Sequence, residues 1–164
     1  MNRGFSLIET IIALSILIVG ILAGLTLTQR SVQTSKINED VVIAVNLARE
    51  GIELVRAIRD SRNLGFSTLV DGNYIVDTDA NFNLSTQADS SDVKLCNNCR
   101  LYFMNGKYTH NQAGSPTIFR RMVNISSGSN LSCGGICEKI VTVYVFREGS
   151  PNPYKLVVHL TNWR

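Results

Sequence analysis

The chain has 164 residues, of which 45% are hydrophobic and 18% are charged, and this predicts one globular domain with one additional element. The net charge of +3 is too small to indicate a nucleic-acid partner, because basic and acidic residues are mixed along most of the chain. The sequence contains no G-x-S-x-G, H-E-x-x-H or P-loop motif, so we expect neither an enzyme nor a cofactor.

The N-terminal part of the chain is almost free of charge. Between Glu9 and Arg30, residues 10–29 form a run of 20 residues without Asp, Glu, Lys or Arg. A helix of that length spans about 30 Å, the thickness of the hydrocarbon core of a bilayer. We therefore predict a polar leader at residues 1–4 and a transmembrane helix at residues 5–29. A plain signal anchor has the same hydropathy, whereas a cleaved secretory signal is disfavoured because no small-residue cleavage site follows the run.

Glu9 is the residue that a plain anchor does not explain. A carboxylate inside a bilayer is costly unless it is paired, so an ionisable residue there indicates a function. Cleavage between Gly4 and Phe5 would create an α-amino cation one helical turn from Glu9. That amine, or the amine of a neighbouring subunit displaced along the helix axis, would neutralise the carboxylate.

The segment from Gly4 to Glu9 reads Gly-Phe-Ser-Leu-Ile-Glu, and the apolar run follows it. This pattern resembles the prepilin-type cleavage and methylation signal of type IV pilins and of type II secretion pseudopilins. The resemblance is close over residues 3–30 and continues loosely, as a long helix, to residue 62. Thr26 stands where many major pilins have a proline, and this favours a PilV-like minor pilin or a pseudopilin.

The resemblance implies a processing and assembly route. A prepilin peptidase would cleave between Gly4 and Phe5 and N-methylate Phe5. Glu9 would set the register of assembly by pairing with the amine of an adjacent subunit. The implied partners are this peptidase, membrane lipid, an assembly platform with its ATPase, and other pilin subunits, which bind through the N-terminal helix.

The same resemblance implies where the protein acts. The chain would cross the cytoplasmic membrane once, with its globular part outside the cytoplasm, and then enter an extracellular or periplasmic filament. Adhesion, motility, DNA uptake and secretion machines all use such subunits. The alternative is a membrane-anchored extracellular binding or adhesion domain that does not polymerise.

Residues 30–63 are predicted to extend the helix as an amphipathic segment. They contain no proline. Apolar residues recur every three or four positions, which is the period of one helix face. We expect this face to pack on the globular domain. The stripe consists of Val41, Val45, Ala48, Ile52 and Val55.

Residues 64–164 are predicted to form a globular, β-rich domain. Asn105-Gly106 is a strong hairpin turn signal between two short strands. We expect an antiparallel meander of three to five strands that packs on the amphipathic helix, giving an α+β, pilin-like fold. The candidate strands are Tyr74 to Asp77, Arg100 to Met104, Lys107 to His110, Thr117 to Ile125, Lys139 to Arg147 and Tyr154 to Thr161.

Four cysteines form two close pairs in the sequence, Cys96 with Cys99 and Cys133 with Cys137. An extracytoplasmic location permits disulfides, and four cysteines allow three connectivities. We expect disulfides but no particular pairing. A tetrathiolate zinc site is the alternative, and it is disfavoured because the second pair has three intervening residues rather than two.

The remaining candidates for chemistry are basic residues and histidines. We expect the doublet Arg120-Arg121 to lie on an exposed strand face. We also expect His110, in a polar loop, and His159, on a strand face, to be exposed to solvent rather than to act as ligands or bases.

Overall fold

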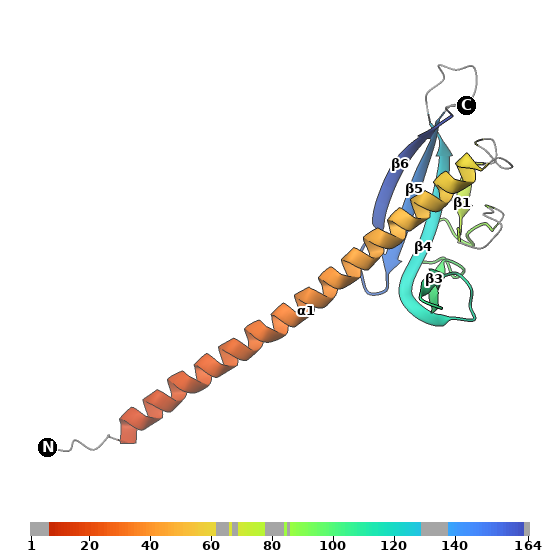
Figure 1. The fold of residues 1–164 in the computed structure, drawn as a ribbon. Coiled ribbons are helices and arrows are strands. Elements are labelled where there is room, and N and C mark those ends of the chain that lie inside the picture. The colour runs from red at the N-terminus through yellow and green to blue at the C-terminus, as the bar shows by residue number, and fades with distance from the viewer. Residues whose placement is uncertain are drawn as a thin grey trace. The chain divides into compact units, whose positions relative to one another are not determined.

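The structure is a computed structural model that describes residues 7–61, 66, 69–77, 84, 86–128 and 138–162. Within these ranges the chain forms one long helix and six strands (Figure 1). Their bounds are α1 (Leu7–Asp60), β1 (Gly72–Tyr74), β2 (Arg100–Met104), β3 (Lys107–Thr109), β4 (Ser115–Ser127), β5 (Glu138–Arg147) and β6 (Tyr154–Thr161).

The chain divides into two compact units, and the division lies inside α1. The first unit is Met1–Val41, and its described part is helix alone. The second unit, Val42–Arg164, contains the remainder of α1 and all six strands; we call it the head unit. The helix ends close to the position predicted from the sequence, where Ser61 N and Ser61 Oγ donate hydrogen bonds to carbonyls of the last turn.

The sheet of the head unit is antiparallel and has the strand order β3-β2-β4-β5-β6. β4 is its centre: one side pairs with β5 along residues 119–127. The other side pairs first with β2, at residues 115–120, and then with β1, at residues 123–125. β1 and β2 therefore lie end to end along the same side of β4. A long helix on an antiparallel sheet is the α+β class that the sequence predicts.

Two details differ from the predicted meander. β4, β5 and β6 follow one another across the sheet, but the β2–β3 hairpin runs outwards, with β3 at the edge, and the chain then returns to the centre at β4. The first strand begins two residues and ends three residues earlier than predicted, at Gly72 and Tyr74. Asp77 explains this shift: its carboxylate accepts hydrogen bonds from Thr109 Oγ1 (2.7 Å) and His110 N (2.6 Å), which draws the chain towards β3.

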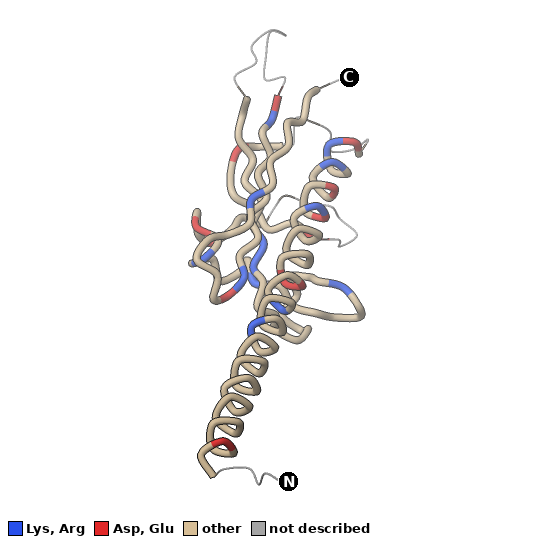
Figure 2. The backbone as a smooth tube through the Cα atoms, turned by 90° about the vertical axis from the view of Figure 1, so that its left-hand side faces the viewer, with Lys and Arg blue, Asp and Glu red and all other residues tan. Residues whose placement is uncertain are grey.

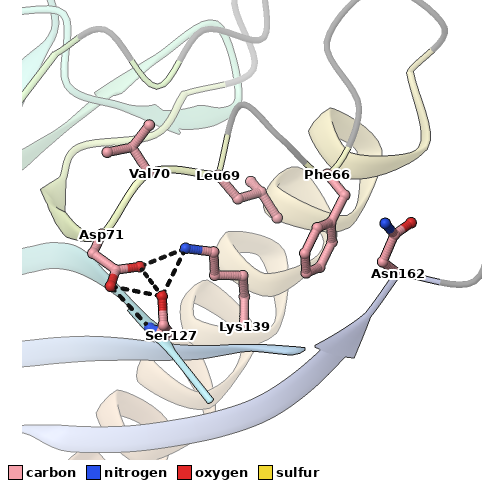
Figure 3. Close-up of a pocket in the computed structure, with 7 residues that line it drawn as sticks. All are labelled: Phe66, Leu69, Val70, Asp71, Ser127, Lys139 and Asn162. Atoms are coloured by element: carbon pink, nitrogen blue, oxygen red, sulfur yellow. Dashed lines mark hydrogen bonds and ion pairs between the residues drawn. The ribbon is translucent and has the colours of Figure 1, made fainter. Parts of the chain in front are cut away.

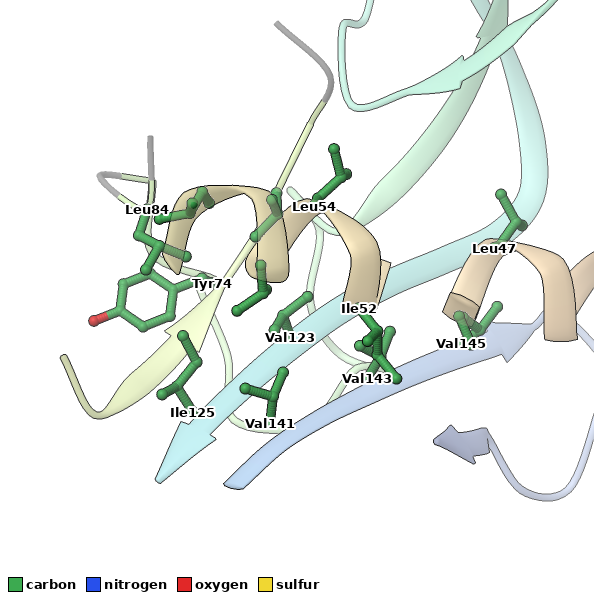
Figure 4. Close-up of a cluster of buried hydrophobic side chains, with 14 of the residues drawn as sticks. Leu47, Ile52, Leu54, Tyr74, Leu84, Val123, Ile125, Val141, Val143 and Val145 are labelled. Carbon is green, nitrogen blue, oxygen red and sulfur yellow. The ribbon is translucent and has the colours of Figure 1, made fainter. Parts of the chain in front are cut away.

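The main core lies between α1 and one face of the sheet, which we call the helix face. Alternate residues of β4 and β5 point towards the helix, as the period of a strand requires. Gly51 allows α1 to approach β5 closely, because a Cβ built on it would lie 3.0 Å from Val143 Cγ1. Figure 4 shows this packing; its labelled residues are Leu47, Ile52, Leu54, Tyr74, Leu84, Val123, Ile125, Val141, Val143 and Val145.

A second, smaller core covers the opposite face of the sheet, which we call the outer face. Residues 86–99 cross this face, and Cys96 and Cys99 are fully buried there beside Met122. Tyr144 and Phe146 of β5 pack against the same cluster. Both faces of β4 and β5 are therefore covered, which explains why β5 is apolar on both sides.

Candidate functional site

The first unit presents an apolar helix with no covering layer among the described residues. The large aliphatic side chains from Leu7 to Leu27 are each more than half exposed, from 53% at Ile18 to 77% at Leu7. Water disfavours such a surface, because each buried aliphatic side chain of this size contributes about 1.5–3 kcal/mol. By length and composition α1 is the one described helix that is able to cross a membrane.

Glu9 is the only charged residue on α1 before Arg30. Figure 2 shows one acidic position, in red, near the start of the helix and a long uncharged stretch after it. The Glu9 side chain is exposed and lies in the first turn of α1. The positive end of the helix dipole lies at that turn, and it favours a carboxylate.

The hydroxyl side chains of this segment are satisfied within the helix itself. Thr10 Oγ1 donates to the Leu7 carbonyl, and Ser15 Oγ to the Ile11 carbonyl, each at 2.8 Å. Thr26 and Thr28 make the same kind of bond to carbonyls three and four residues earlier. The polar groups of residues 10–28 therefore need no partner outside the helix, and the segment is compatible with lipid or with other apolar helices.

The structure describes some of the predicted site residues but not all of them. Glu9 lies where the sequence predicts it, on the apolar helix. The cleavage and methylation residues Gly4 and Phe5 lie outside the described residues. So do Cys133 and Cys137.

Cys96 and Cys99 form a disulfide, with their Cα atoms 5.3 Å apart. The sequence left the pairing open, and the structure assigns the local one for this pair. A disulfide consumes both thiolates, so this pair does not supply ligands to a tetrathiolate zinc site. Among the described residues, no group of three or more His, Cys, Asp or Glu side chains is placed to hold a metal ion.

Arg121 is fully buried, so the predicted exposure of this residue is wrong. Its Nη1 lies 3.1 Å from Glu50 Oε2 of α1, and its Nη2 lies 3.6 Å from Asp77 Oδ1. The guanidinium also donates to the backbone carbonyls of Leu47 (3.4 Å) and Val76 (2.9 Å). One side chain thus joins α1, β4 and the segment after β1.

His110 belongs to the same buried group, contrary to the predicted exposure. Only 5% of its side chain is exposed, and its Nε2 lies 3.3 Å from the Arg121 carbonyl oxygen. A carbonyl only accepts, so this nitrogen is the donor. His159, in contrast, is 59% exposed as predicted, and its Nδ1 lies 2.6 Å from Glu138 Oε1.

Arg121, Glu50, Asp77 and His110 form a mostly buried cluster, and two of these groups have shifted pKa values. Burial opposes ionisation of Asp77, but hydrogen bonds from the His110 side chain, Thr109 and the His110 backbone outweigh it and lower its pKa to about 2. Burial lowers the pKa of Arg121, and the negative charges of Glu50 and Asp77 oppose that effect. The cluster therefore holds charges of both signs under the helix.

A pocket of about 590 Å³ lies at another place in the head unit (Figure 3). Lys139 Nζ is bonded there to Asp71 Oδ1 (2.6 Å) and to Ser127 Oγ (3.0 Å). The hydrogen bond from Lys139 lowers the pKa of Asp71. An ammonium held by a carboxylate is a poor base for Ser127, so this arrangement acts as a clamp between the start of β1 and the adjoining ends of β4 and β5. Phe66, Leu69, Val70 and Asn162 complete the lining.

No family model, curated protein or solved structure matches this chain. Functional inference therefore depends on the sequence from Gly4 to Glu9 and on the geometry described above. Within the described residues, the exposed apolar helix with its single carboxylate is the feature that packing of the head unit does not explain.

Proposed function

We propose that this chain is a structural subunit of a type IV pilus-like or type II secretion filament, as a minor pilin or pseudopilin. The observation that carries the proposal is an apolar helix with exposed side chains from Leu7 to Leu27, which has one carboxylate, Glu9, in its first turn. The pilin-like sequence from Gly4 to Glu9 includes the first described residues of this helix. The fold supports the proposal at the coarser level of a long helix on an antiparallel sheet.

The proposed route begins in the cytoplasmic membrane. A prepilin peptidase cleaves between Gly4 and Phe5 and methylates the new amine of Phe5. The helix remains in lipid until an assembly platform and its ATPase transfer the subunit to the filament. In the filament the helices of neighbouring subunits replace lipid as the apolar environment.

Glu9 has a role in register rather than in bulk affinity. Burial of the apolar side chains supplies most of the favourable free energy, because its contribution grows with the area removed from water or lipid. An unpaired carboxylate in that environment is costly, and a neighbouring amine at the right height offsets the cost. Only one axial offset between helices brings the two charges together, so the pair selects that offset.

Mass spectrometry of the mature protein tests the processing step. We expect a chain that begins with N-methyl-phenylalanine at Phe5. A mature protein that retains Met1 would remove the amine that Glu9 needs. It would favour the alternative, a membrane-anchored binding or adhesion domain that does not polymerise.

Replacement of Glu9 tests the assembly step. We expect Glu9→Leu to be cleaved and inserted normally but to enter filaments at least about tenfold less than the wild type, because the charge pair is absent. Incorporation is measured by immunoblotting of sheared filaments against the membrane fraction.

Glu39→Leu is the matched control, since Glu39 is an exposed acid on the same helix beyond the apolar run. It should assemble normally. Equal incorporation of both variants would contradict the role of Glu9.

A further inference from the structure

A groove of about 460 Å³ lies between α1 and β6 in the head unit. Ile52, Leu156 and Val158 give it an apolar floor. β6 is the terminal strand of the described sheet, and it pairs with β5 over eight consecutive residues without a bulge. We call this feature the α1–β6 groove; its lining is Arg49, Ile52, Glu53, Arg56, Leu156, Val157 and Val158.

The rim of the α1–β6 groove has an excess of positive charge. Arg56 Nη1 forms an ion pair with Glu53 Oε1 at 2.6 Å. Arg49 is exposed and forms no hydrogen bond or ion pair with any residue that the structure describes, so its guanidinium is available to a partner. An apolar floor with a cationic rim favours a partner that combines an apolar side chain with a carboxylate.

Such a combination occurs on the head unit itself, at a turn of residues 92–95 that we call the Leu95 turn. Leu95 is 71% exposed, the largest exposed fraction among the large hydrophobic residues described for the head unit. The turn is well fixed, because the Asp92 carbonyl accepts hydrogen bonds from Leu95 N and Cys96 N, both at 3.0 Å. Val93 is buried beneath it, next to the disulfide.

The outward charge of the Leu95 turn is negative. Asp92 is exposed, and Asp89 adds a second exposed carboxylate a few residues earlier. Lys94 does not cancel this charge at the surface. Its Nζ donates to the Pro151 carbonyl at 2.7 Å and lies 5.8 Å from the centre of the Phe146 ring.

The turn and the groove lie on opposite faces of the sheet. The Leu95 turn belongs to the segment on the outer face, with Met122 and Phe146. The α1–β6 groove lies on the helix face. One copy therefore cannot fill its own groove with its own turn, but the turn of one copy can reach the groove of the next. Such a contact joins two different surfaces of identical chains, so each added copy offers a free surface to the next. If the rotation from copy to copy does not close a ring, the contact generates an open helical filament.

We propose that the Leu95 turn of one copy seats in the α1–β6 groove of the next, with Leu95 on the apolar floor and Asp92 facing Arg49. The inference rests on the proposed function and specifies the contact between head units in the filament. The N-terminal helices then supply the bulk of the affinity, and this contact sets the rotation between successive head units.

A photo-reactive amino acid in place of Leu95 tests the contact in the full-length chain. On irradiation of assembled filaments we expect an adduct between two copies, mapped by mass spectrometry to residues 49–56 or 156–158. The high exposure of Leu95 makes this replacement tolerable, and an intact Cys96–Cys99 disulfide in the product shows that the turn is folded. Adducts mapped to another surface, or to another protein, would overturn the proposal.

A second probe separates this inference from the proposed function. The photo-reactive residue is placed at Val19, on the exposed apolar helix. Helix cross-links without a Leu95 adduct would reject the head contact and leave the filament role intact. Absence of helix cross-links to any pilin subunit would reject the filament role, and with it the inference.

Charge reversal tests the electrostatic part. We expect Arg49→Glu to reduce the Leu95 adduct about tenfold and to invert its dependence on salt, because the attraction to Asp92 becomes a repulsion that salt screens. Lys107→Glu, at an exposed position on β3, is the matched control and should leave the adduct unchanged. Equal losses in both variants would contradict the pairing with Asp92.

Discussion

Arg121 fixes the position of α1 on the sheet, although it lies in a strand far from the helix in sequence. Its guanidinium contacts Glu50 and the Leu47 carbonyl on α1, and Asp77 and the Val76 carbonyl after β1. A buried cation tolerates little displacement of these partners, because each lost contact leaves a charge without water or a partner. The cluster therefore selects one register of helix against sheet.

Asp77 should make the head unit sensitive to acid. Its pKa is about 2 in the folded chain, below the 3.8 of an unperturbed carboxyl, so the folded state favours the ionised form. The resulting stabilisation is present above about pH 4 and is lost as the pH falls towards 2. After allowance for solvent screening it amounts to about 1–2 kcal/mol.

Asp77→Asn should lower the free energy of unfolding by about this amount at pH 7 and by little at pH 2. Thermal unfolding of the full chain in detergent, followed by near-UV circular dichroism, measures both values. Asp92→Asn, an exposed carboxylate, serves as control. A loss for Asp77→Asn that does not change with pH would contradict the assignment.

The sequence contained part of the information needed to predict that Arg121 is buried. Phe119, Arg121, Val123 and Ile125 alternate along β4, and this period places the arginine on the same face as the apolar residues. Its acidic partners come from α1 and from residue 77, and no local pattern links them. The fold class, by contrast, followed from local patterns.

At the scale of elements, turn chemistry and periodicity predicted β2 and β6 with their observed bounds. The hairpin at Asn105-Gly106 was predicted because both residues tolerate positive φ, and they have φ of 51° and 77°. β1 was displaced because its end depends on Asp77 contacts with distant residues. Short edge strands are therefore the least predictable part of this sheet.

Substitution of Gly51 tests the packing between α1 and β5. A Cβ at this position would lie 3.0 Å from Val143 Cγ1 and 3.3 Å from Val143 Cγ2. Gly51→Val should therefore destabilise the head unit by about 1–3 kcal/mol through overpacking. Gly51→Ala should be nearly neutral, because its helix propensity gain of about 1 kcal/mol offsets a milder clash.

Thermal unfolding in detergent measures these changes. Gly20→Val is the control, since nothing lies within 4 Å of a Cβ at Gly20. Equal effects at the two glycines would show that propensity rather than helix–sheet contact decides the result.

At the scale of the whole molecule, the two units should differ in solubility: the head unit should dissolve in buffer, and the apolar helix should not. A chain that begins at Arg30 lacks the exposed aliphatic side chains of residues 7–27 and retains only Val32, Ile37 and Val42 as large exposed hydrophobics on α1. We expect it to be monomeric in buffer, whereas the full chain requires detergent or lipid. Size-exclusion chromatography with light scattering distinguishes these states, and an aggregated Arg30 fragment would contradict the division.

The order of the elements along the chain affects synthesis of the protein. The helix residues that contact the sheet, from Ala44 to Ile58, leave the ribosome well before β4, which begins at Ser115. During that interval the aliphatic stripe has no native partner, because β4, β5 and β6 have not yet been translated. The nascent chain is then exposed to misassembly, and a holdase or early membrane insertion would protect it until the final hairpins emerge.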